Sequence, residues 1–157
     1  MARSIGSRLP DELQALLDGS ALEQHVGVTL ELLSTTADNW PHLAMLSVGE
    51  VLAPDASHVR LALWPHATAV ANLEHVGRAT LALVYQGRGY SIRLQVQRAA
   101  DLDTPLSGRL ARFGGEVQDV LKDVAPYAVL ETGTRFRLND ESGTLTRWRQ
   151  VIAALRA

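Results

Sequence analysis

The chain has 157 residues, a length that suits one compact domain able to bury about 70% of the surface of its unfolded form. Its net charge of −2 leaves no concentrated basic face, so we expect no nucleic-acid partner. The absence of cysteine excludes disulfides, thiolate metal sites and cysteine nucleophiles. No apolar run approaches the ~20 residues that span a bilayer, and residues 1–10 lack the apolar core of a signal peptide. We therefore expect a cytoplasmic protein with no membrane partner.

The N-terminal part of the chain predicts a helix followed by a strand. The helix begins near Pro10, with acidic residues in its first turn, and Gly19 ends it. Its apolar stripe is made of Leu13, Leu16 and Leu17. Residues 27–35 then alternate in the strand period, which predicts the first strand of a sheet.

The middle of the chain predicts strands interrupted by one short helix. A strand opens at His42 and is expected to continue to about Leu52, with Gly49 as a bend. Residues 58–64 alternate as a further strand. A helix follows over about 67–76, where apolar residues recur at a spacing of three. Such a helix start, placed between two strands, is a suitable place to hold a phosphate.

The remainder of the chain predicts a hairpin and three further elements. Residues 79–85 and 90–97 are strands joined by a Gly-containing turn. Residues 103–125 have apolar side chains at helical spacing and are expected to be largely helix, whereas 127–138 are expected to form a strand. A last helix is expected over 142–156. We predict one domain over 1–157, with about six strands and helices packed outside.

The residues that commonly carry chemistry form no recognisable constellation, and no catalytic residue can be named. No nucleophile–base pair is visible, so a hydrolase or transferase is poorly supported. The histidines show no tight pairing, and we expect no metal site; they are His25, His42, His58, His66 and His75. Thr68, at the start of the short helix, either donates to a phosphate or simply caps the helix.

The order of these elements and several local residues resemble one known family. A strand that ends in Thr35 leads through a turn to the pair Pro41-His42, which opens the next strand. The short helix carries the pair Asn72-Leu73, and the strand after it begins at Arg78. With this order and spacing the chain resembles the pyridoxamine 5′-phosphate oxidase-like family over residues 28–99.

The resemblance implies a mainly β fold, an FMN-binding split β-barrel of Greek-key type with flanking helices. It also implies a homodimer with two FMN sites at the subunit interface. The strand that contacts the flavin ring would comprise His42, Leu43, Ala44, Met45 and Leu46. The phosphate region would span 64–69 and include Trp64, His66, Thr68 and Ala69, and Arg93 would face the partner subunit's flavin.

The chain departs from the family at the phosphate site. The lysine that pairs with the phosphate aligns with Ala69, and the arginine before it aligns with Thr68. Losing both charged hydrogen bonds would cost roughly 3–6 kcal/mol, or about two to four decades of affinity. Backbone amides, Thr68, His66 or one of three arginines are available to offset that loss; the arginines are Arg60, Arg78 and Arg93.

Two functions follow from this comparison. The first is an FMN-dependent oxidoreductase of unknown small-molecule substrate, in which the cofactor carries the chemistry and the protein supplies a binding pocket. The vitamin B6 oxidase reaction itself is disfavoured, because basic residues to clamp a substrate phosphate are not evident. The alternative is a dimeric split-barrel binding protein without catalytic activity, either cofactor-free or holding another cofactor such as a deazaflavin or haem.

Overall fold

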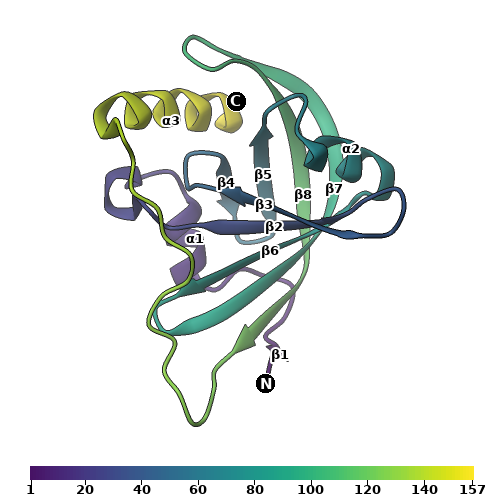
Figure 1. The fold of residues 1–157 in the computed structure, drawn as a ribbon, viewed down its shortest axis with the longest axis vertical. Helices are drawn as coiled ribbons and strands as arrows, with labels where there is room; N and C mark the ends of the chain where they lie inside the picture. Colours follow the sequence, from purple (N-terminus) through teal and green to yellow (C-terminus); the bar gives the residue numbers. More distant parts are fainter.

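The computed structural model describes residues 1–157, and an antiparallel sheet of eight strands forms its centre (Figure 1). The strands are β1 (Arg3–Ser4), β2 (Leu30–Thr35), β3 (Pro41–Leu46), β4 (Val51–Asp55), β5 (His58–Leu63), β6 (Arg78–Tyr85), β7 (Arg88–Thr104) and β8 (Gly108–Asp123). The helices are α1 (Asp11–Leu17), the 3-10 turn η1 (Leu22–His25), α2 (Thr68–Val76) and α3 (Glu141–Arg156). The strand order is β3-β2-β6-β7-β8-β5-β4, and β1 pairs with β8.

The long strands β7 and β8 make the sheet curl around its core. The first part of β7 pairs with β6, whereas the first half of β8 pairs with β5. Register shifts at Arg93/Leu94 and Ala99/Leu102 interrupt the β7–β8 ladder, and such bulges bend and twist a strand pair. Buried side chains from distant strands belong to one core inside this curl; examples are Leu32 of β2, Leu61 of β5 and Ile92 of β7.

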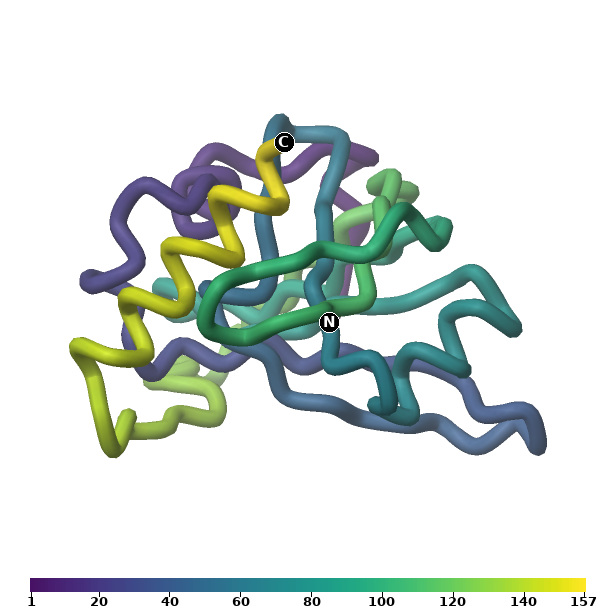
Figure 2. Tube along the Cα trace, turned by 90° about the horizontal axis from the view of Figure 1, so that it is seen from above, coloured from purple at the N-terminus to yellow at the C-terminus, as the bar shows by residue number.

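The helices cover the open parts of the core. Leu13, Leu16 and Leu17 of α1 are buried, as the stripe predicted, and α1 contacts β4. Helix α3 lies beside the far end of the β7–β8 hairpin (Figure 2), where the backbone amide of Leu106 donates to Oε1 of Gln150. No helix of the chain has the length and hydropathy needed to cross a bilayer.

Several predicted elements are confirmed. The short helix begins at Thr68 and ends at the left-handed Gly77, and α3 begins after Asp140, whose side chain accepts from the amide of Gly143. The hairpin turn between β6 and β7 consists of Gln86 and Gly87, both with positive φ, which is the backbone that a two-residue hairpin requires.

The predicted helix over 103–125 is wrong, because this segment forms the end of β7 and the strand β8. Phe113, Gly115 and Val117 alternate inward in the strand period, and the register shift then moves the next buried residue to Val120. That spacing of three, produced by a bulge, imitates the period of a helix. At Gly115 an added Cβ would lie 3.1 Å from the carbonyl oxygen of Val59, so the glycine suits a tightly paired strand.

Two strand predictions also need correction. The strand expected from His42 to Leu52 is two strands, because the chain turns at Ser47–Glu50 between β3 and β4. The strand expected over 127–138 is irregular apart from one bridge between Val28 and Arg135. Most of that segment lies outside the sheet, and its apolar residues Tyr127 and Val129 are almost fully exposed.

Candidate functional site

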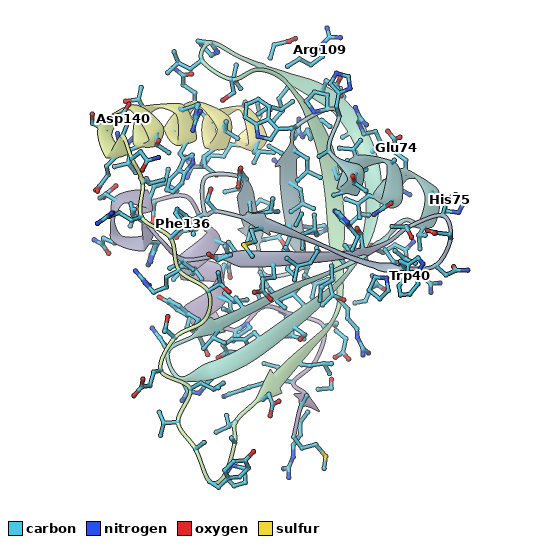
Figure 3. All side chains as sticks on the ribbon, in the orientation of Figure 1. Trp40, Glu74, His75, Arg109, Phe136 and Asp140 are labelled. Carbon is cyan, nitrogen blue, oxygen red and sulfur yellow. The ribbon has the colours of Figure 1, made fainter.

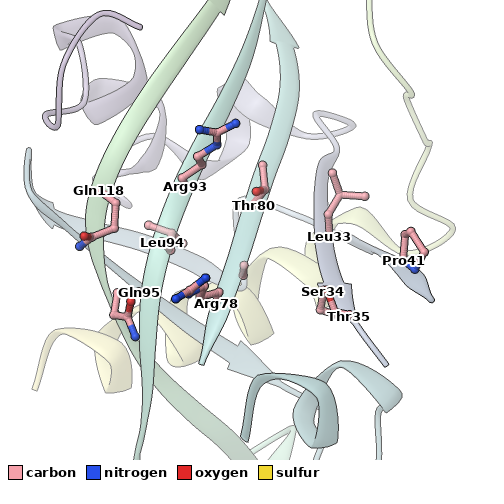
Figure 4. Close-up of a pocket in the computed structure, with 11 residues that line it drawn as sticks. Leu33, Ser34, Thr35, Pro41, Arg78, Thr80, Arg93, Leu94, Gln95 and Gln118 are labelled. Carbon is pink, nitrogen blue, oxygen red and sulfur yellow. The ribbon is translucent and has the colours of Figure 1, made fainter. Parts of the chain in front are cut away.

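A cleft opens where strands β2 and β6 part. Their pairing ends at Leu33 and Thr80; beyond that point β2 stays with β3, and β6 stays with β7 (Figure 4). The space between them has a volume of about 610 Å³, within the range of small-molecule and cofactor sites. It is lined by Leu33, Ser34, Thr35, Pro41, Arg78, Ala79, Thr80, Arg93, Leu94, Gln95 and Gln118.

Strand register brings the polar side chains of the cleft together. The two-residue turn sets β6 against β7 so that Thr80 is opposite Arg93 and Arg78 is opposite Gln95. Residues directly opposite in an antiparallel pair lie on the same face of the sheet, so these four side chains form one polar surface. Figure 4 shows Arg78 and Arg93 on neighbouring strands beside the cleft.

The cleft carries positive charge that the protein leaves largely uncompensated. Arg78 takes part in none of the ion pairs of the structure. The one acidic partner of Arg93 is Asp119, whose Oδ2 lies 3.8 Å from Nη1 of Arg93. The Arg93 side chain is 59% exposed, so this pair is weak. Two available guanidinium groups suit an anionic ligand, because arginine binds phosphate and carboxylate groups through two parallel hydrogen bonds.

One wall of the cleft is held from behind by helix α2. Nδ2 of Asn72 donates to Oγ of Ser34 at 3.0 Å, and both residues are buried. A buried polar pair of this kind is costly to break, because either partner alone would be left without a hydrogen bond. The pair Asn72-Leu73 therefore has a structural role: it ties the short helix to the end of β2.

Strand β3 borders the cleft with an apolar surface. Pro41 lines the cleft, and Leu43 and Met45 point to the same side, 44% and 61% exposed. Together with Trp40, which is 69% exposed, these residues form what we call the apolar strip. The other ring-contacting candidates, His42, Ala44 and Leu46, alternate to the opposite side and are half-buried or buried.

The predicted phosphate region does not contribute to the lining of this cleft. His66, Thr68 and Ala69 are absent from its lining, and the Ala69 side chain is buried in the core. Thr68 makes no capping hydrogen bond to α2. Trp64 lines a separate small cavity beside α3. Any contact of the β3 residues or of the phosphate region with a cofactor stays a prediction; the phosphate region comprises Trp64, His66, Thr68 and Ala69.

Of the three arginines considered as substitutes, the structure places two in the cleft. Arg60 instead donates from Nη1 to the carbonyl oxygens of Leu155 and Arg156 at the end of α3. Thr80, Gln95 and Gln118 were not singled out from the sequence. The hairpin turn could have revealed Thr80 and Gln95. Once Gln86-Gly87 is taken as a two-residue turn, the strand register follows, and it pairs Thr80 with Arg93 and Gln95 with Arg78.

Comparison with known proteins supports the fold. No family model matches the chain. The protein YclD of Bacillus subtilis, which is uncharacterized, is 32% identical over 148 residues that cover 94% of this chain and 96% of YclD.

Among solved structures, a Lactobacillus delbrueckii protein provisionally assigned as a pyridoxamine 5′-phosphate oxidase has a TM-score of 0.59 at 14% identity, covering 75% of this chain and 98% of its own. An F420 reductase has a TM-score of 0.50 at 11% identity, and the match covers 71% of this chain and 95% of the reductase chain. The chain thus belongs to the same family as YclD and has the split-barrel fold of the pyridoxamine 5′-phosphate oxidase-like proteins.

Proposed function

We propose that the protein is an FMN-binding oxidoreductase whose cofactor lies in the cleft between β2 and β6. The observation that carries the proposal is the pair of uncompensated arginines, Arg78 and Arg93, at the point where the two strands part. Two proteins of the same fold are named as a provisional oxidase and a reductase, which makes a flavin or a deazaflavin the first cofactor to test.

The residues of the cleft fit such a group. Arg78 and Arg93 would hold its phosphate, and Thr80, Gln95 and Gln118 offer further polar groups. Each charged hydrogen bond contributes about 1.5–3 kcal/mol, so two arginines match the roughly 3–6 kcal/mol lost with the lysine and arginine that this chain lacks. The backbone groups of Ser34 and Thr35 that face β6 lie beyond the last pairing of the two strands. They could therefore form hydrogen bonds with the edge of the flavin ring.

The work of the protein in this proposal is binding and orientation. Bound FMN would supply hydride or single-electron chemistry, which no side chain here provides. Asn72 keeps Ser34 and the end of β2 in position, while the guanidinium groups fix the charged end of the ligand. The apolar strip beside the open side of the cleft supports a homodimer, in which a second copy would close the site and exclude water.

The test is a visible absorption spectrum of the purified protein, followed by titration with FMN. We expect retained or rebound flavin, and a loss of about tenfold to a hundredfold in affinity for Arg78→Gln and for Arg93→Gln. Arg109→Gln is the matched control, because Arg109 lies at the tip of the β7–β8 hairpin, far from the cleft (Figure 3). The same titration with F420 distinguishes FMN from a deazaflavin.

Two results would contradict the proposal. If both arginine variants bind FMN as tightly as the unmodified protein, the cofactor is not held in this cleft. A colourless protein that retains neither FMN nor F420 would instead favour the cofactor-free dimer or another cofactor such as haem.

A further inference from the structure

A second cavity, distinct from the cleft, lies between helix α3 and the turn that leads into β4. Its volume is about 90 Å³, and its walls include Glu50, Trp64, Arg147 and Trp148. None of these residues lines the cleft between β2 and β6. We call it the α3 cavity.

The α3 cavity contains a carboxylate with few partners. Both hydrogen bonds of the Glu50 side chain go to Oε2, from the amide of Ser47 at 2.6 Å and from its hydroxyl at 3.1 Å. Oε1 accepts no hydrogen bond, and Glu50 forms no ion pair. Burial raises the pKa of this carboxyl above its ordinary value. Oε1 is not among the fully buried atoms that lack a partner, so it can meet solvent or a ligand in the cavity.

A guanidinium lines the same cavity without forming an ion pair with that carboxylate. Arg147, in the second turn of α3, contributes to the wall but forms no ion pair with Glu50 or with any other acid. Two opposite charges therefore share one small space beyond ion-pair distance, and the charge of Arg147 only partly offsets the effect of burial on the pKa of Glu50. A ligand that carries both charges would complement both groups at once.

The other walls are two indole rings. Trp148 is buried and packs directly against Gly49, where a Cβ atom would overlap its ring, so this wall is held in place. Trp64 is 54% exposed, which leaves the cavity accessible from solvent. Indole faces accept both an ammonium group and short apolar groups.

We propose that the α3 cavity binds a small zwitterionic amino acid. Its ammonium group would meet Oε1 of Glu50, its carboxylate would meet Arg147, and its carbon atoms would lie against the indoles. The small volume of about 90 Å³ favours a small amino acid such as glycine or alanine. A simple cation would be repelled by Arg147, and a simple anion by Glu50.

Tryptophan fluorescence tests this proposal, since two of the three tryptophans line the cavity. Purified protein is titrated with glycine and alanine, and in parallel with ethylamine and acetate as ligands of single charge. We expect a saturable change with an amino acid, and at least tenfold weaker binding of ethylamine and acetate. Glu50→Gln and Arg147→Gln should each weaken amino-acid binding by tenfold or more.

Arg149→Gln is the control, because Arg149 lies on the same helix but outside the cavity and faces Glu23 at the surface. Thermal unfolding confirms that each variant is folded, and Arg147→Gln, at a half-buried position, keeps the test valid if Glu50→Gln fails to fold. The proposal is overturned if no amino acid gives a saturable signal, which would mean a water-filled cavity. It is equally overturned if ethylamine binds as tightly as alanine, or if Arg147→Gln binds normally. Each result is independent of whether the cleft holds FMN.

Discussion

At the scale of single residues, the half-buried carboxyl of Glu50 should make stability depend on pH. Burial raises its pKa in the folded protein, so the folded state holds this proton more tightly than the unfolded chain does. The stability that Glu50 contributes is then complete below the unfolded pKa and is lost as pH rises through the folded pKa. In urea unfolding between pH 4 and 7, we expect the free energy of unfolding of Glu50→Gln to rise, relative to that of the unmodified protein, as pH rises. A difference that does not change with pH would refute this role.

Tyr90 and Glu12 form a pair with the opposite pH dependence. The Tyr90 hydroxyl donates to Oε1 of Glu12 at 2.6 Å, and this bond lowers the pKa of Glu12. Burial, and then the same bond, raise the pKa of Tyr90 to about 12. Because the folded pKa of Glu12 is depressed, its stabilising effect is present above the unfolded pKa and disappears as pH falls through the folded value. We expect Tyr90→Phe to lower the free energy of unfolding by about 1 kcal/mol at pH 7, a modest loss because the bond is only partly buried, and by less at pH 3. An equal cost at both pH values would contradict the coupling.

At the scale of elements, the packing of α3 on the turn before β4 depends on the absence of a side chain at Gly49. A Cβ atom there would overlap the ring of Trp148, which cannot move away without disturbing the buried face of α3. We expect Gly49→Ala to destabilise the protein by about 1–3 kcal/mol, measured by thermal or denaturant unfolding. Gly114→Ala is the control, since a Cβ at Gly114 meets nothing within 4 Å. Equal effects of the two substitutions would show that the packing of Trp148 is not the cause.

The contact between α2 and β2 makes a second prediction at this scale. Asn72→Ala leaves the hydroxyl of Ser34 without its buried partner and should cost about 1–3 kcal/mol. In a double-mutant cycle with Ser34→Ala, the two losses should not add, because both remove the same hydrogen bond. Strictly additive losses would mean that the bond contributes little and that Asn72 acts through packing alone.

At the scale of the whole molecule, the apolar strip predicts self-association. Met45→Lys places a charge in the middle of the strip and should shift the protein from dimer to monomer in analytical ultracentrifugation. If the cleft is completed by the second copy, the affinity for FMN should fall in the same variant. Val129→Lys is the control, because Val129 is 82% exposed but lies in the irregular segment before α3. A dimer that tolerates Met45→Lys would exclude the strip as its interface.

The amino-acid sequence by itself determined those elements whose signals are local. The stripe of α1, the start of α2 and the presence of a hairpin turn at Gln86-Gly87 each depend on neighbouring residues only. The split barrel was indicated by the resemblance to the pyridoxamine 5′-phosphate oxidase-like family, which rested on the order of elements over residues 28–99 and on local pairs such as Pro41-His42 and Asn72-Leu73.

Only the tertiary structure decided the rest, because it depends on pairing between distant segments. The spacing of Val117 and Val120 is ambiguous between a helix and a bulged strand, and pairing with β5 and β7 resolves it. The candidate site has the same origin. Arg78 and Arg93 become neighbours of Ser34 only because β2 pairs with β6 as far as Leu33 and then separates from it. Local preferences cannot specify where such a pairing stops, since that point is set by the curvature of the whole sheet.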